Sequence, residues 1–179
     1  IVLSEKAFRY VEEKMEQLYK EPQTSDIVRR HILESAVRSP KEWHLEEIKK
    51  AYARDDKEWK MTGVFGMGHS QGFEKEIMEA LDDESSDVHL EAIYAAGRQE
   101  LNSAWPHVQN ILEDENSPKE LLIAAINVSA SINPEESVEY LGQYSGSTDD
   151  DIVEAAEEAM QLATILLDEF DEEDEEDEN

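Results

Sequence analysis

The chain has 179 residues, of which 45 are acidic and 16 basic, for a formal net charge of −29 at pH 7. It contains no cysteine, which excludes disulfides, thiolate zinc sites and cysteine nucleophiles and favours a reducing, cytoplasmic location. No apolar stretch approaches the roughly 18 residues that a membrane span requires, so we expect a soluble protein that does not act in a membrane.

The negative charge is concentrated in the second part of the sequence. Residues 1–60 carry 13 basic and 13 acidic side chains, whereas residues 61–179 carry 3 basic and 32 acidic ones. Such a surface repels phosphate groups and lacks the Lys and Arg side chains that drive nucleic-acid binding. We therefore expect neither nucleic acid nor membrane as a partner. Halophilic adaptation stays open as a second origin of the acidic composition.

Residues 1–20 predict a first helix, because Phe8, Val11, Met15 and Leu18 recur at helical spacing. The chain starts with the apolar residues 1–3, whereas the end of a repeat array usually has a polar outer face. The sequence therefore predicts either a monomer or a part of a longer solenoid.

Five later segments repeat one pattern of apolar and small residues. They are Val28–Ala36, Trp59–Gly68, Val88–Gly97, Leu121–Val128 and Ile152–Met160. Their first residues lie 31, 29, 33 and 31 positions apart. Small residues such as Ala92 and Ala95 form a stripe on which another helix can pack closely. Each segment is therefore expected to be a helix that is packed on both sides.

Shorter apolar-periodic stretches lie between these segments and predict a second set of helices. They are Leu45–Tyr52, Phe73–Leu81, Trp105–Leu112 and Val138–Leu141. Ser39-Pro40, Ser117-Pro118 and Asn133-Pro134 each place a capping side chain before a proline at the first helical position. No segment shows the sustained alternation of a strand, so the fold class is all-α.

The repeat resembles the HEAT repeats of the phycobilisome-lyase-like type. These have the pattern Val-Arg-x-x-Ala-Ala-x-Ala-Leu-Gly, and the best match is Asp87–Gly97, followed by Ala104–Leu112. The resemblance covers residues 24–167. The chain also resembles the C-terminal part of longer bacterial and archaeal HEAT-repeat proteins. It implies a scaffold that binds other proteins. The Arg of the pattern is kept only at Arg29, so a charge ladder between repeats is expected to be interrupted in the later ones.

Catalytic and cofactor sites find little support in the residue patterns. The five histidines form no His-Glu-x-x-His pair, and neither Asp82-Asp83-Glu84 nor Asp149-Asp150-Asp151 is followed by the Gly and Glu of a calcium-binding loop. Capping of helix starts is the favoured role for both acidic runs. The glycine-rich stretch 63–68 is not followed by the Lys-Ser/Thr pair of a phosphate-binding loop. Its glycines are therefore expected to allow close helix packing. We expect no cofactor and no metal.

These observations predict a right-handed α-solenoid of about five helix pairs and a terminal helix over residues 1–170. The repeats are expected to start near residues 24, 55, 86, 117 and 148, and an acidic tail follows at 171–179. Acidic side chains at the C-terminal end of a helix oppose its dipole, which argues against a long helical extension into this tail.

The function expected from this fold is non-catalytic binding of a basic protein or peptide along the concave face, which the second helix of each pair would line. The candidate residues on that face are Lys49, Lys50, Glu74, Glu76, Glu79, His107, Asn110, Glu139 and Tyr140. The alternative is an enzyme or enzyme accessory of the phycobilin-lyase-like HEAT class.

Overall fold

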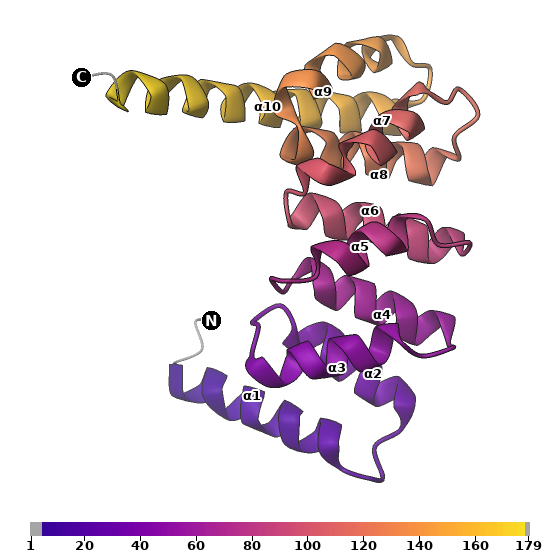
Figure 1. The fold of residues 1–179 in the computed structure, drawn as a ribbon, viewed down its shortest axis with the longest axis vertical. Helices are drawn as coiled ribbons and strands as arrows, with labels where there is room; N and C mark the ends of the chain where they lie inside the picture. The colour runs from indigo at the N-terminus through magenta and orange to yellow at the C-terminus, as the bar shows by residue number, and fades with distance from the viewer. Residues whose placement is uncertain (1–4, 178–179) are drawn as a thin grey trace. The chain divides into compact units, whose positions relative to one another are not determined.

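The computed structural model describes the backbone of residues 5–177 and the side chains of residues 7–169. Within this range the chain is helical and contains no strand, so the predicted all-α, HEAT-like fold is confirmed (Figure 1). The apolar residues 1–3 and the last two residues of the acidic tail lie outside the described range. The α-helices are α1 (Glu5–Lys20), α2 (Asp26–Ala36), α3 (Glu42–Tyr52), α4 (Lys57–Gly68), α5 (Glu74–Leu81), α6 (Ser86–Arg98), α7 (Trp105–Glu113), α8 (Lys119–Ile132), α9 (Pro134–Leu141) and α10 (Asp150–Asp177).

The chain divides between Phe73 and Glu74 into two compact units. The first unit contains α1 to α4, and the second contains α5 to α10 with two short 3-10 turns, η1 (Asn102–Ala104) and η2 (Gly142–Gly146). The long repeat helices α2, α4, α6, α8 and α10 start at the intervals that the sequence pattern predicts.

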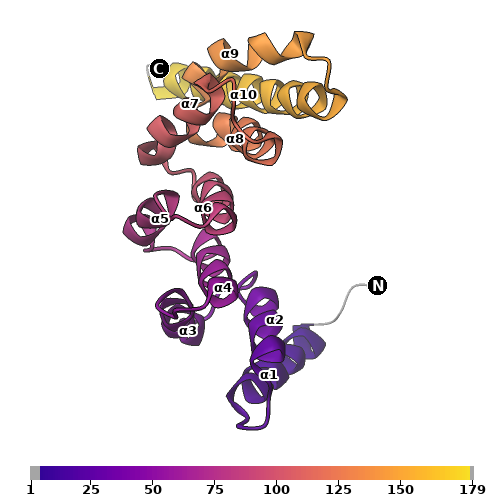
Figure 2. The same ribbon diagram turned by 90° about the vertical axis from the view of Figure 1, so that its right-hand side faces the viewer.

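The helices of the second unit pair as α5 with α6, α7 with α8 and α9 with α10, and α8 packs against both α6 and α10. Figure 2 shows α5 and α7 on the same side of α6 and α8. In the first unit, α3 packs on α4 in the same way. The sequence pattern predicts pairs in which the shorter helix follows the long one, whereas in the structure the shorter helix precedes its closest long partner. A repeat period is compatible with both pairings, because every long helix has neighbours on two sides.

The core consists largely of small and β-branched side chains on the long helices. Ala92, Ala95 and Ala125 have no exposed surface, and Ala156 is 3% exposed. Their positions confirm the predicted small-residue stripe, because an alanine lets the backbone of a packed helix come close. Removal of apolar surface from water in this layer is the main source of its stability.

The glycines of α4 are packing residues, as the sequence predicts. A Cβ atom on Gly63 would lie 2.6 Å from the backbone nitrogen of Tyr52, and one on Gly66 would lie 2.6 Å from Cγ1 of Ile48. Both contacts are with α3, so the absence of a side chain allows α3 and α4 to approach each other. Gly72, in the link before α5, has a φ of +89°, a conformation that glycine adopts without strain.

Two of the three predicted serine and asparagine caps are wrong. Asn133 caps α9, since its side chain accepts a hydrogen bond from the backbone N–H of Glu136 at 3.1 Å. Ser39 instead donates to the carboxylate of Glu12, and Ser117 donates to the carbonyl oxygen of Ile111. Both prolines that follow these serines precede the helix, because α3 starts at Glu42 and α8 at Lys119.

Helix α10 continues to Asp177, which is further than the sequence analysis predicts. Each added residue of a helix gains a backbone hydrogen bond, and Glu has a high helix propensity. These local terms favour the extension, whereas the unfavourable interaction of carboxylates with the helix dipole opposes it.

Candidate interaction surfaces

The second unit has a strongly acidic surface. Residues 74–179 carry 3 basic and 32 acidic side chains. Each of the three basic residues pairs with a carboxylate of the same unit: Lys75 with Glu79 at 3.1 Å, Lys119 with Asp149 at 2.8 Å, and Arg98 with Glu91. The unit therefore presents a large excess of carboxylates that these three cations do not neutralise.

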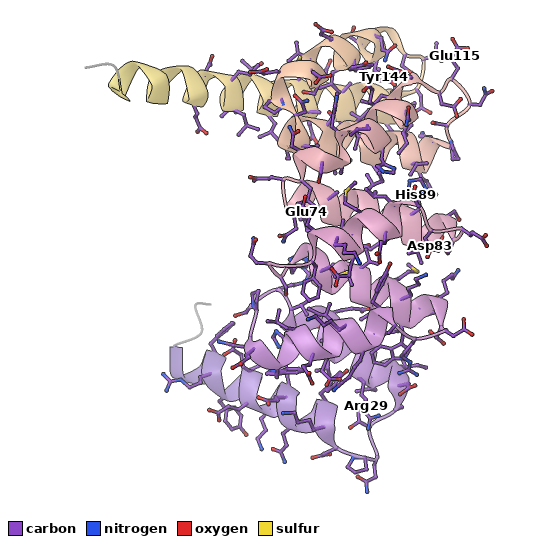
Figure 3. The ribbon with its side chains drawn as sticks, in the orientation of Figure 1. Arg29, Glu74, Asp83, His89, Glu115 and Tyr144 are labelled. Atoms are coloured by element: carbon purple, nitrogen blue, oxygen red, sulfur yellow. The ribbon has the colours of Figure 1, made fainter. Side chains whose placement is uncertain are left out.

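A hydrogen bond connects α5 to the turn before α7. Ser103, in η1, donates to the carboxylate of Glu74 at 2.9 Å. Glu74 is exposed at the N-terminal end of α5 and is labelled in Figure 3. The contact joins two successive shorter helices, so α5 and α7 contribute to one surface.

Three further contacts connect α7 to α9. The indole N–H of Trp105 donates to Glu136 at 2.9 Å, and the amide of Gln109 donates to the hydroxyl of Tyr140 at 2.7 Å. The Tyr140 hydroxyl in turn donates to Glu113 at 2.8 Å. Hydrogen bonds from Gln109 and Tyr140 lower the pKa of Glu113, and the bond to this carboxylate raises the pKa of Tyr140. We call the surface formed by α5, α7 and α9 the short-helix face.

The candidate residues from the sequence fall into both units. Lys49 and Lys50 lie on α3 in the first unit, and the other seven lie on the short-helix face of the second unit. On that face Glu74, Glu79, Asn110 and Glu139 are exposed, and Glu76, His107 and Tyr140 are half-buried. Tyr140 also packs its ring edge-on against Trp105, with centroids 5.9 Å apart, so part of its role is structural. The sequence analysis missed Glu113 and Glu136, which lie on the same face and whose helical spacing could have indicated them.

A charge contact between long helices persists where the sequence predicts an interruption. Lys119, at the start of α8, pairs with Asp149 and, at 2.6 Å, with Asp151 at the start of α10. The side chain of Asp149 also accepts the backbone N–H of Asp151 at 3.1 Å, which confirms the predicted capping role of this acidic run. The other acidic run does not cap its helix: the N-cap of α6 is Ser85, without a side-chain cap bond, and Asp83 accepts the N–H of Ser85 itself at 2.9 Å. The repeat pattern did not predict the role of Lys119. This lysine lies two residues before the start of its repeated segment, whereas the pattern has its basic residue at the second position, as in Arg29.

His89 on α6 is a partly buried imidazole whose Nε2 has no hydrogen-bond partner among the described residues (Figure 3). Burial and the nearby His107 lower the pKa of His89, and Asp82 opposes them. Across residues 7–169, whose side chains are described, no group of three or more His, Asp or Glu residues is arranged to hold a metal ion. Over the same part of the chain, no helix combines the length and apolar character needed to cross a membrane.

Residues 74–161 match the family of HEAT repeats. This part of the chain, which we call the HEAT segment, is therefore similar to HEAT repeats. The match begins at the first residue of α5, and the HEAT segment therefore contains the pairs α5/α6 and α7/α8, with α9 and the first part of α10 as the third pair. A search of curated proteins found no match to the sequence. Stacked helical repeats of this kind present extended surfaces that bind other proteins.

Proposed function

We propose that the protein is a non-catalytic scaffold that binds a basic protein or peptide on the short-helix face of its HEAT segment. The observation that carries this proposal is the charge of the second unit, which has 32 acidic side chains and only 3 basic ones. A polyanionic surface attracts cationic partners and repels anionic ones, which raises the association rate and excludes wrong partners.

The hydrogen bonds between the short helices support this assignment. They hold α5, α7 and α9 through Glu74, Glu136 and Tyr140, so the face is fixed before a partner arrives. A preorganised surface loses less conformational entropy on binding than a mobile one. The exposed carboxylate of Glu139 on this face can pair with Lys or Arg, whereas that of Glu79 already pairs with Lys75.

The test compares capture of partners by charge variants of the full chain. The variant E74K/E76K/E79K reverses three charges on α5, and the control E13K/E21K/E42K makes the same charge change at exposed positions of the first unit. Wild type and control are expected to retain basic proteins from a lysate at low salt, identified by mass spectrometry. The α5 variant should bind the same proteins on the order of tenfold more weakly.

Two results would contradict the proposal. Equal capture by all three proteins would place the binding surface outside α5. A chromophore or metal ion present at one equivalent in the purified protein would favour the phycobilin-lyase-like alternative instead, so absorbance and metal content are measured on the same sample. Melting temperatures of the three proteins show whether the loss of the Ser103–Glu74 hydrogen bond has unfolded the variant.

A further inference from the structure

The first unit contains a cleft that is lined largely by cationic side chains. The cleft has a volume of about 370 Å³ and lies among α1, α2, α3 and α4. Its lining includes four cationic side chains, Lys20, Arg29, Lys50 and Arg54, but only two carboxylates, Asp26 and Glu47. We call it the basic cleft. Two further carboxylates outside the lining, Glu16 and Glu46, pair with Lys20 and Lys50.

Two arginines of the basic cleft share a single carboxylate. Arg54 binds Asp26 through Nη2 at 2.7 Å, and Nη1 of Arg29 lies 3.8 Å from the same side chain. The hydrogen bond from Arg54 holds the pKa of Asp26 below its ordinary value. One carboxylate neutralises one guanidinium, so this pair of arginines retains one positive charge.

Both guanidinium groups are held in position by contacts other than Asp26. Nε of Arg29 donates to the carbonyl oxygen of Tyr19 at 3.0 Å, and Nη2 donates to that of Glu21 at 2.8 Å. The guanidinium of Arg54 lies 4.4 Å from the ring of Trp59, which is a cation–π contact. The planar donors are therefore preorganised, and little side-chain entropy remains to be lost on binding.

Two buried aromatic side chains and two exposed lysines also line the cleft. Tyr19 and Trp59 are buried, and the Tyr19 hydroxyl donates to Glu47 at 2.9 Å. Lys20 and Lys50 are 59% and 62% exposed, and their carboxylate partners Glu16, Glu46 and Glu47 lie on the same two helices as the lysines. Ion pairs at such exposure contribute little to stability, so a ligand carboxylate can replace these partners at small cost.

We propose that the basic cleft binds a carboxylate-rich segment of a partner protein, whose acidic side chains pair with Arg54 and Lys50. Guanidinium groups bind carboxylates through two parallel hydrogen bonds, and the Trp59 ring holds the Arg54 guanidinium in position for such a contact. This binding is independent of the acidic short-helix face. The protein would then carry one surface for a basic partner and another for an acidic one.

The experiment uses the full chain and a synthetic acidic peptide, Asp-Glu-Glu-Asp-Glu-Glu-Asp-Glu-Asn, which has the sequence of residues 171–179. The chain has three tryptophans, Trp43, Trp59 and Trp105, so their indole N–H signals are easily resolved by NMR and can be assigned with a Trp59→Phe variant. Titration at moderate salt, which screens repulsion by the second unit, should shift the Trp59 signal and leave Trp105 unchanged. The peptide with Asn and Gln in place of Asp and Glu should shift neither.

Charge variants identify the cations that bind the peptide. The variant K50Q/R54Q should raise the Kd on the order of tenfold, while the control K14Q/K49Q, which makes the same charge change outside the cleft, should raise it less than about twofold. A Trp59 signal that does not move, or an equal loss in both variants, would overturn the proposal. Inorganic phosphate that moves the Trp59 signal as strongly as the peptide at equal charge would also overturn it, since the cleft would then be a general anion site. Both variants must keep the melting temperature of the wild type.

Discussion

Gly97 of α6 lies directly against Val128 of α8. A Cβ atom on Gly97 would be 2.5 Å from Cγ1 of Val128 and 2.6 Å from its Cβ. Both residues are buried in the layer where the long helices of the second unit stack. Gly97 is also the glycine at the end of the HEAT-like pattern. It lies one residue before the end of α6 at Arg98, and its lack of a side chain allows α8 to come close.

Replacing Gly97 with Ala should therefore destabilise the protein. In an open helix the same change would stabilise by up to about 1 kcal/mol, but here the new methyl group overlaps a branched side chain. Overpacking of this kind costs about 1–3 kcal/mol. Urea denaturation followed by circular dichroism measures the difference. The control is Gly142→Ala, since a Cβ atom there would have nothing within 4 Å. A Gly97→Ala variant as stable as that control would show that α6 and α8 can separate without cost.

Removal of Lys119 should lower stability in a pH-dependent way. Its hydrogen bonds hold the pKa of Asp149 below the ordinary value of 3.8 and raise the pKa of Lys119 above 10.5. A carboxylate with a lowered folded pKa contributes stability above its unfolded pKa and loses it as the pH falls through the folded value. Lys119→Gln should therefore melt below the wild type at pH 7, and the difference should shrink as the pH falls below the ordinary aspartate pKa of 3.8.

The control for this pair is Lys75→Gln, which removes a contact within α5 alone. Because Lys119 joins two helices, its replacement should have the larger effect on the melting temperature. An equal effect of the two variants would mean that the contact between α8 and α10 contributes no more stability than an ordinary surface ion pair.

Tyr140→Phe should raise the pKa of Glu113. In the folded protein Gln109 and Tyr140 donate to this carboxylate and lower its pKa, since hydrogen bonds favour the charged form. The variant lacks one of the two donors, so the pKa should move back towards its ordinary value. Titration of the side-chain carboxyl carbon by NMR measures it. A pKa that stays at the wild-type value would show that Tyr140 does not donate to Glu113 in solution. Tyr144→Phe is the control, because the Tyr144 hydroxyl binds the carbonyl oxygen of Leu112 instead.

Truncation after Phe170 should leave stability unchanged or slightly raise it at low salt. The change removes eight of the 45 acidic side chains and the unfavourable interaction of this charge with the C-terminal end of α10. Thermal melts at several salt concentrations should show a gain that shrinks as salt is added. A clear loss of stability would mean instead that the tail docks on the rest of the chain.

The sequence by itself determined the helical repeat of this protein. The spacing of Val28, Trp59, Val88, Leu121 and Ile152 predicted where the long helices lie, because burial of one helix face requires apolar and small residues at a 3.6-residue period. The uneven charge of the two parts of the chain could also be read directly from the sequence. Both properties depend on residue type and position along the chain, and neither needs knowledge of contacts.

Only the tertiary structure decided which helices pair and which side chains join them. The period of the pattern is the same whether α5 is grouped with α4 or with α6, so the preference of α5 for α6 needed the contacts themselves. The bonds from Trp105 to Glu136 and from Lys119 to Asp149 connect residues about one repeat apart. The sequence did not predict the basic cleft for the same reason, because its cations come from different helices. Along the chain, these cations lie in a segment with equal numbers of basic and acidic side chains. Charged side chains interact strongly only when folding brings them within a few ångströms of one another.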